Sequence, residues 1–152
     1  AYDLARLPHS GVHTQLCGDA HLNNFGLFAS PERTLLFDIN DFDESLPGPF
    51  DWDLRRLAAS FAIAADVHGH DEARQRAVVD TLVRAYADRL ARFARMDVLD
   101  VWYYRLTAET LLELSGDDEH ELEVIRKARR KTSALFAAEA TERLPDVRWN
   151  IQ

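Results

Sequence analysis

The sequence is poor in cysteine and in lysine. Cys17 is the one cysteine among 152 residues, so no disulfide can form within the chain. A reducing compartment suits such a chain, and we expect a cytoplasmic protein. Of the 18 basic residues, only Lys127 and Lys131 are lysine and 16 are arginine. A site that depends on lysine therefore cannot be built from residues 1–126.

Long hydrophobic runs are also absent. The longest run of small apolar residues, 58–67, is interrupted by Ser60 and Asp66, whereas a membrane span needs ~18 apolar residues. We therefore expect no membrane partner. Acidic residues outnumber basic ones by 26 to 18, and the net charge of −8 disfavours binding to nucleic acid. With 47% hydrophobic residues the chain is long enough for one domain with a core.

The order of the apolar patterns predicts an α+β, mostly helical fold. A short strand is expected within 12–17, a hairpin from strands 25–28 and 34–37, and a loop over 38–50 marked by Pro47-Gly48-Pro49. Apolar spacing of three and four residues then predicts helices that end near Gly69, Met96, Leu114 and Leu144. Asp51 or Asp53 is expected to cap the first of these helices or to favour its positive end, and Thr107 to cap the third. We expect one unit over 1–152, with the loop and hairpin in 12–50 and the helical remainder in 51–145.

Residues 18–41 hold the parts of a phosphoryl-transfer site. Such a site needs an aspartate near the acceptor hydroxyl and oxygen ligands that hold Mg²⁺ against the nucleotide phosphates. Asp19 and Asn24 lie five residues apart, after Gly18, which permits a tight turn. The hairpin that follows would return the chain beside this loop, at Asp38 and Asp41.

These residues carry a family resemblance. Gly18-Asp19-x-His21-x-x-Asn24 resembles the loop of the aminoglycoside and choline phosphotransferases, which are relatives of protein kinases. Asn40-Asp41-Phe42 and Asp53-Leu54 resemble their metal-binding and structural aspartates. At closer range, residues 11–60, with Cys-Gly-Asp-Ala-His-Leu-Asn-Asn-Phe-Gly and Asp-Ile-Asn-Asp-Phe-Asp-Glu, are similar to an uncharacterised bacterial family, domain of unknown function 2252.

The resemblance implies the carboxyl-terminal lobe of a protein-kinase-like fold with a small β-hairpin at its catalytic loop. It also implies Mg²⁺, ATP as phosphate donor, and an unknown small-molecule or protein hydroxyl acceptor. The implied catalytic residues are Asp19, the base, and His21, which shapes the loop. Asn24 and Asp41 are the implied metal and nucleotide ligands, and Gly18 and Asp53 are the implied structural residues. Asp43 is a further candidate metal ligand, and Asp38 competes with Asp41 for the metal. Cys17 departs from the family pattern, which usually has a histidine there.

Four carboxylates crowd the stretch 38–44, and such a cluster repels itself unless a cation or an arginine neutralises it. Arg55 and Arg56 are candidates for that role, and a solvated acidic loop is the alternative to a metal site. The residues Trp102, Tyr103 and Tyr104 are interpreted as core residues in preference to an acceptor pocket.

A kinase-like site also needs a lysine that grips the nucleotide phosphates, on an amino-terminal lobe that precedes the catalytic loop. No lysine precedes Cys17, so we expect a fragment without that lobe, inactive by itself. The alternatives are a kinase-like module that binds nucleotide or a partner without catalysis and, less favoured, a metallophosphoesterase, which would need an Asp-x-His motif before the loop.

Overall fold

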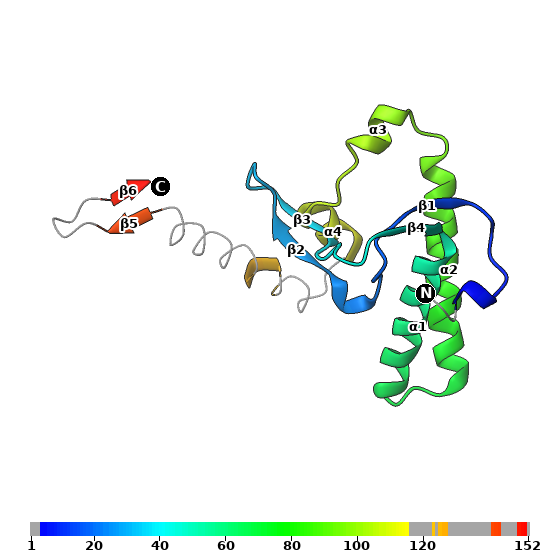
Figure 1. The fold of residues 1–152 in the computed structure, drawn as a ribbon. Helices are drawn as coiled ribbons and strands as arrows, with labels where there is room; N and C mark the ends of the chain where they lie inside the picture. Colours follow the sequence, from blue (N-terminus) through cyan, green and yellow to red (C-terminus); the bar gives the residue numbers. More distant parts are fainter. Residues whose placement is uncertain (1–3, 116–122, 124, 128–140, 144–148, 152) are drawn as a thin grey trace. The chain divides into compact units, whose positions relative to one another are not determined.

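The computed structural model describes residues 4–115, 123, 125–127, 141–143 and 149–151. The fold is α+β, as the sequence predicts (Figure 1). About half of the described residues are in helices, where the sequence predicted a mostly helical fold. The strands are β1 (His13–Leu16), β2 (Phe25–Ala29), β3 (Leu35–Ile39), β4 (Leu46–Pro49), β5 (Thr141–Arg143) and β6 (Trp149–Ile151). The helices are α1 (Asp51–Val67), α2 (Glu72–Phe93), α3 (Val98–Trp102) and α4 (Ala108–Ser115), with short 3₁₀ turns η1 (Leu4–Arg6) and η2 (Leu22–Asn24).

The chain forms two compact units. The first comprises residues 1–26 and 39–104, and the second comprises 27–38 and 105–152. A compact unit is not by itself a domain, so one domain over 1–152 stays a prediction, as does the kinase-like lobe.

Strand β4 lies in the segment predicted as a loop. It pairs antiparallel with β1, in a register that sets His13 opposite Pro49 and Leu16 opposite Leu46. Prolines lack the N–H that a ladder uses, so Pro47 and Pro49 argue against a central strand but fit an edge strand. Within the described part of the chain this sheet consists of β1 and β4, so both are edge strands. The prediction of a loop over all of 38–50 is therefore wrong at β4.

The predicted hairpin is confirmed as β2 and β3. Its turn is held by the backbone N–H of Ser30, which donates to the carbonyl of Thr34 (2.9 Å), and by that of Arg33, which donates to the carbonyl of Ser30 (2.8 Å). Arg33 lies at a φ of 65°, the left-handed conformation that lets the chain reverse.

Helix α1 begins where the sequence predicts, but without a side-chain cap. Its N-cap is Phe50, which makes no capping hydrogen bond with its side chain. Asp51 and Asp53 both lie in the first turn, where their charge favours the positive helix end. Their carboxylates instead bind other segments: Asp51 Oδ1 accepts from the N–H of Ser10 (3.0 Å), which lowers the pKa of Asp51. The capping alternative is therefore wrong for both residues.

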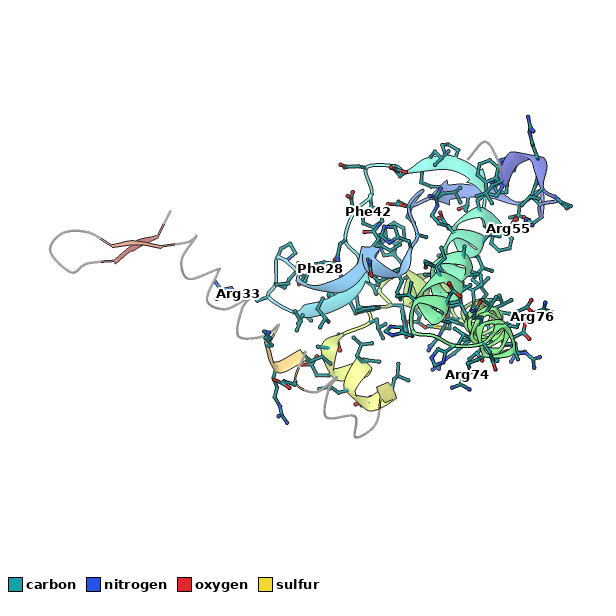
Figure 2. All side chains as sticks on the ribbon, turned by 90° about the horizontal axis from the view of Figure 1, so that it is seen from below. Phe28, Arg33, Phe42, Arg55, Arg74 and Arg76 are labelled. Carbon is teal, nitrogen blue, oxygen red and sulfur yellow. The ribbon has the colours of Figure 1, made fainter. Side chains whose placement is uncertain are left out.

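Helices α1 and α2 form a helical hairpin in the first unit and lie side by side (Figure 1). Asp71 caps α2 by accepting from the N–H of Arg74 (2.8 Å), and Arg74 and Arg76 project from its first turns (Figure 2). The predicted apolar stripe of α2 has two exposed members, Val83 and Leu90, and four half-buried ones, Val79, Leu82, Tyr86 and Phe93. No helix among the described residues is long and apolar enough to cross a membrane.

The second unit has a small core of its own. Leu35 of β3, Ala108 of α4 and Ile125 are buried together. They are covered by the partly buried side chains Leu27, Leu111 and Leu112. The predicted cap of α4 is confirmed, because Thr107 Oγ1 accepts from the N–H of Thr110 (3.2 Å).

The predicted long helix from 117 to 144 lies largely outside the described residues. Residues 123 and 125–127 are helical, in agreement with it. Residues 141–143 form β5, which pairs antiparallel with β6, so the prediction is wrong there. The partner strand comes six residues later in the chain, and local periodicity carries no information about such a pairing.

Candidate functional site

The candidate site residues lie in the first unit, except for Asp38, which belongs to the second. Asp53 of α1 holds the start of the site's loop. Asp53 Oδ2 accepts from the N–H of Cys17 (2.9 Å), and Oδ1 accepts from the N–H of Gly18 (3.2 Å). One half-buried carboxylate thus satisfies two successive backbone donors, which stabilises a turn that has no sheet or helix partner for them. Asp53, which the resemblance implies is a structural residue, thus binds the backbone at the start of the loop.

Gly18 makes a close backbone approach possible. Its φ is +85°, a conformation that L side chains rarely adopt. A Cβ at this position would lie 1.8 Å from the carbonyl oxygen of Glu44, so any other residue would push the loop away from the segment after β3. The structural role predicted for Gly18 has this steric basis.

Asn24 joins the two aspartates of the site. Its side chain is buried, with 6% exposed. The amide Nδ2 donates to the backbone carbonyls of Asp19 and Asp41, both at 3.0 Å, and Oδ1 accepts from the N–H of Asp41 (3.0 Å). The backbone N–H of Asn40 also donates to the carbonyl of Asn24 (2.8 Å). The hairpin therefore returns Asp41 to the loop, as the sequence predicts.

The Asp19 carboxylate is contacted at both oxygens. Oδ1 lies 3.5 Å from Arg56 Nη1, and Oδ2 lies 3.2 Å from His21 Nε2. His21 Nδ1 accepts from the backbone N–H of Asn23 (3.2 Å). A neutral ring that accepts at Nδ1 carries its proton on Nε2, so His21 is assigned as a donor to Asp19. The Asp19 side chain is 37% exposed and thus remains accessible.

Two residues of α1 that bind the loop were not predicted in these roles. Arg56 contacts Asp19, and Ser60 Oγ accepts from the backbone N–H of Leu22 (3.0 Å). With Asp53 they follow the spacing 53, 56 and 60, which places them on one face of a helix. In the sequence, polar residues at this spacing next to the apolar residues of α1 indicate a helix that binds a polar loop on that face. Arg55 and Arg56 were expected to neutralise the carboxylates of 38–44. Arg56 instead pairs with Asp19, and Arg55 pairs with Asp51 (3.1 Å).

Asp41 has the accessibility that a metal ligand needs. It is exposed, and its Oδ1 accepts from the N–H of Asp43 (2.9 Å). Asn24 Oδ1 uses one of its two lone pairs on Asp41 N–H, so the oxygen types fit a magnesium ion that also binds phosphates and water. Among the described residues, no three His, Cys, Asp or Glu side chains gather in a way that could hold a metal by themselves. The carboxylate of Asp43 is exposed, as is Asp38.

Cys17 stands at the start of the loop with a half-buried side chain. Burial raises the pKa of its thiol, and the negative charge of Asp53 raises it further. The thiol therefore stays protonated at neutral pH, as expected of a small packed residue and not of a reactive one.

The aromatic residues after α2 differ from expectation. The side chains of Trp102 and Tyr103 are 79% and 62% exposed, so their interpretation as core residues is wrong. Tyr104 packs edge-on against Phe93, with ring centroids 4.9 Å apart, and its hydroxyl accepts from Arg89 (3.3 Å).

Comparison with known protein families identifies the family of the chain. A family model covers residues 1–151, which is almost the whole chain. The chain belongs to the DUF2252 family. This family is described as "Uncharacterized protein conserved in bacteria", so membership confirms the predicted bacterial family and assigns no activity. No curated protein and no solved structure matches this DUF2252 chain.

Proposed function

We propose that this DUF2252 chain supplies the catalytic loop and metal-binding half of an ATP- and Mg²⁺-dependent phosphotransferase with a kinase-like carboxyl-terminal lobe. The observation that carries the proposal is the Asn24 clamp. One buried amide holds the backbones of Asp19 and Asp41 together, although these two aspartates lie 22 positions apart in the chain with a hairpin between them. The acceptor is a hydroxyl on a small molecule or a protein.

The loop residues have distinct roles in this proposal. Asp19 orients the acceptor hydroxyl and takes its proton as the oxygen attacks the γ-phosphorus of ATP, while the bond from that phosphorus to the bridging oxygen breaks and ADP leaves. Its accessible carboxylate is held by His21 from within the loop. Gly18 and Asp53 fix the backbone on which Asp19 stands.

Asp41 and Asn24 would hold the magnesium ion, and Asp43 is close enough in the chain to assist. When bound, the ion neutralises charge on the nucleotide phosphates. The exposed carboxylate of Asp41 fits this role, because a phosphate-bound magnesium ion typically takes one or two protein carboxylates. The lysine that binds the nucleotide phosphates in related sites would come from outside residues 1–126, because these residues contain no lysine.

A kinase-like module that binds nucleotide or a partner without catalysis is the second candidate. The observation in its favour is that the three hydrogen bonds of the Asn24 amide all go to backbone atoms. Such a residue stabilises the loop whether or not a metal binds. We do not propose a metallophosphoesterase, because a two-metal centre needs several His and Asp ligands together and the described residues contain no such group.

The experiment that tests the proposal measures MgATP binding by calorimetry and phosphate transfer with a panel of hydroxyl acceptors, on the natural full-length protein. We expect Asp19→Asn to lower turnover by about 10²–10⁴-fold with MgATP binding retained. Asp41→Asn should weaken the magnesium dependence of ATP binding and lower turnover.

The matched control is Asp66→Asn, which removes one carboxylate charge from α1 at a position where Asp66 accepts from Gln75 (3.0 Å). This variant should retain turnover. Wild-type turnover in both site variants would refute the proposal. ATP binding that requires Asp41 but gives no transfer with any acceptor would favour the non-catalytic module.

A further inference from the structure

Helix α1 contacts the loop at three points along one face. Asp53 accepts from backbone N–H groups at the start of the loop, and Ser60 accepts from the N–H of Leu22 near its end. Arg56 stands between them on the helix and is the member of the three that reaches a side chain of the loop, the Asp19 carboxylate. The other two contacts set where the backbone runs, so Arg56 has a different task.

The Asp19 carboxylate is a planar group that can rotate about the bond to its Cβ. A hydrogen bond at one oxygen leaves that rotation partly free, whereas donors at both oxygens define the plane. His21 supplies a donor at Oδ2 from the loop itself, and Arg56 supplies one at Oδ1 from a rigid helix. A donor mounted on a helix is placed more precisely than one mounted on a loop.

We propose that Arg56 is a positioning residue that fixes the orientation of the Asp19 carboxylate before substrate binds. The role of that orientation in catalysis rests on the proposed function, while the contact itself does not. Arg56 is 34% exposed and Asp19 is 37% exposed, so their ion pair contributes little to the stability of the fold.

The chain contains a matched control for Arg56. Arg55 precedes it on α1, has a side chain of similar exposure (38%), and points about 100° away around the helix. Its guanidinium pairs with Asp51 and donates to the carbonyl of Pro8. A change at Arg55 thus alters the same charge on the same helix without touching Asp19.

The first measurement needs no activity. In isotope-labelled full-length protein, the resonance of the Asp19 side-chain carboxyl carbon reports on the surroundings of that group. We expect Arg56→Gln to shift this resonance and Arg55→Gln to leave it in place, with the amide spectra of both variants showing a folded protein. An unmoved resonance in Arg56→Gln, or an equal shift in Arg55→Gln, overturns the inference.

The second measurement is turnover. Arg56→Gln should lower kcat by about 100-fold with KM for MgATP unchanged, because misplacing a reacting group costs rate and not nucleotide affinity. Arg56→Lys should recover part of this loss, since lysine keeps the charge but lacks the planar guanidinium. Arg55→Gln should stay within about twofold of wild type.

The two measurements separate the inference from the proposed function. A shifted Asp19 resonance together with unchanged turnover in Asp19→Asn would reject the proposed function and keep the positioning contact. Lost turnover in Asp19→Asn, with both resonance and turnover intact in Arg56→Gln, would keep the proposed function and reject the role of Arg56.

Discussion

The loop 17–24 and the helices α2 and α3 belong to the same compact unit, but different kinds of interaction stabilise them. The loop is rich in side-chain-to-backbone hydrogen bonds and contains the buried residues Ala20 and Asn24. Helix α2 has 22 residues and none of them is buried, and in α3 Val98 and Leu99 are 81% and 67% exposed. The difference teaches that polar contacts determine the conformation of the candidate site, while α2 and α3 depend on helix propensity and partial burial. Four predictions test this contrast.

The largest effect is expected at Gly18. Gly18→Ala would combine a positive φ with a Cβ 1.8 Å from the Glu44 carbonyl oxygen, and should cost about 3 kcal/mol or more of unfolding free energy. Gly11→Ala is the matched control, with a φ of +74° and no atom within 4 Å of the added Cβ, and should cost about 1–2 kcal/mol. Urea unfolding measures both, and equal losses would show that the approach to Glu44 does not matter.

The next effect is expected at Asn24. Asn24→Ala removes three hydrogen bonds and leaves the carbonyls of Asp19 and Asp41 without their amide donor, so it should cost about 2–3 kcal/mol. Asn23 is exposed, and the contact that it makes to His21 comes from its backbone N–H, so Asn23→Ala should cost about 0.5 kcal/mol or less. If the two variants unfolded at the same urea concentration, the clamp would contribute nothing to stability.

A smaller effect follows from Cys17. Because burial and the charge of Asp53 raise the pKa of its thiol, the unfolded chain loses this proton at lower pH than the folded chain. The stability that the neutral thiol provides is therefore complete below the usual cysteine pKa and is lost as pH rises through the raised value. Tyr86 changes the unfolding free energy in the same direction at higher pH, because burial and, as a smaller cause, the charge of Asp53 raise its pKa.

Unfolding free energies measured between pH 7 and pH 10 should thus fall more steeply for wild type than for Cys17→Ser, which has no thiol to titrate. Labelling by iodoacetamide, which reacts with the thiolate, should be slower for folded than for urea-unfolded protein at pH 8. Equal labelling rates would contradict a raised thiol pKa.

The smallest effect is expected on α3. Leu99 is 67% exposed, so Leu99→Gln should change the unfolding free energy by about 0.5 kcal/mol or less. The midpoint of urea unfolding measures this change. A loss as large as that of Asn24→Ala would show that α3 is packed in solution and would remove the contrast between the two regions.

The elements that were predicted correctly are those whose residue pattern lies within a short stretch of the chain. The apolar spacing of α1 and α2 and the β-prone runs of β2 and β3 each lie within a short stretch of chain, so each could be read from the residues themselves. Strand β4 could not, since Pro47 and Pro49 resemble loop residues until β1 pairs with them. Strand β5 was also missed because it depends on pairing with another segment, in this case β6, which comes later in the chain.

The site was predicted by residue type and completed by tertiary contacts. Gly18, Asp19, Asn24 and Asp41 stood out because of their spacing in the chain and because the resemblance to phosphotransferases implies roles for these positions. The part played by Arg56 was missed, because its partner Asp19 lies 37 residues earlier in the chain. A helix periodicity shows which residues share a face but not which segment that face will meet.

The sequence by itself determined the apolar spacing of α1 and α2, the β-prone runs of β2 and β3, and the glycine, carboxylate and amide residues of 17–24 and 38–53. Only the tertiary structure decided which group each carboxylate binds: Asp53 accepts from Cys17 and Gly18, and Asp51 accepts from Ser10, 41 residues away. The reason is physical. A carboxylate accepts from any donor that comes within about 3 Å, and the fold alone determines which donor comes that close.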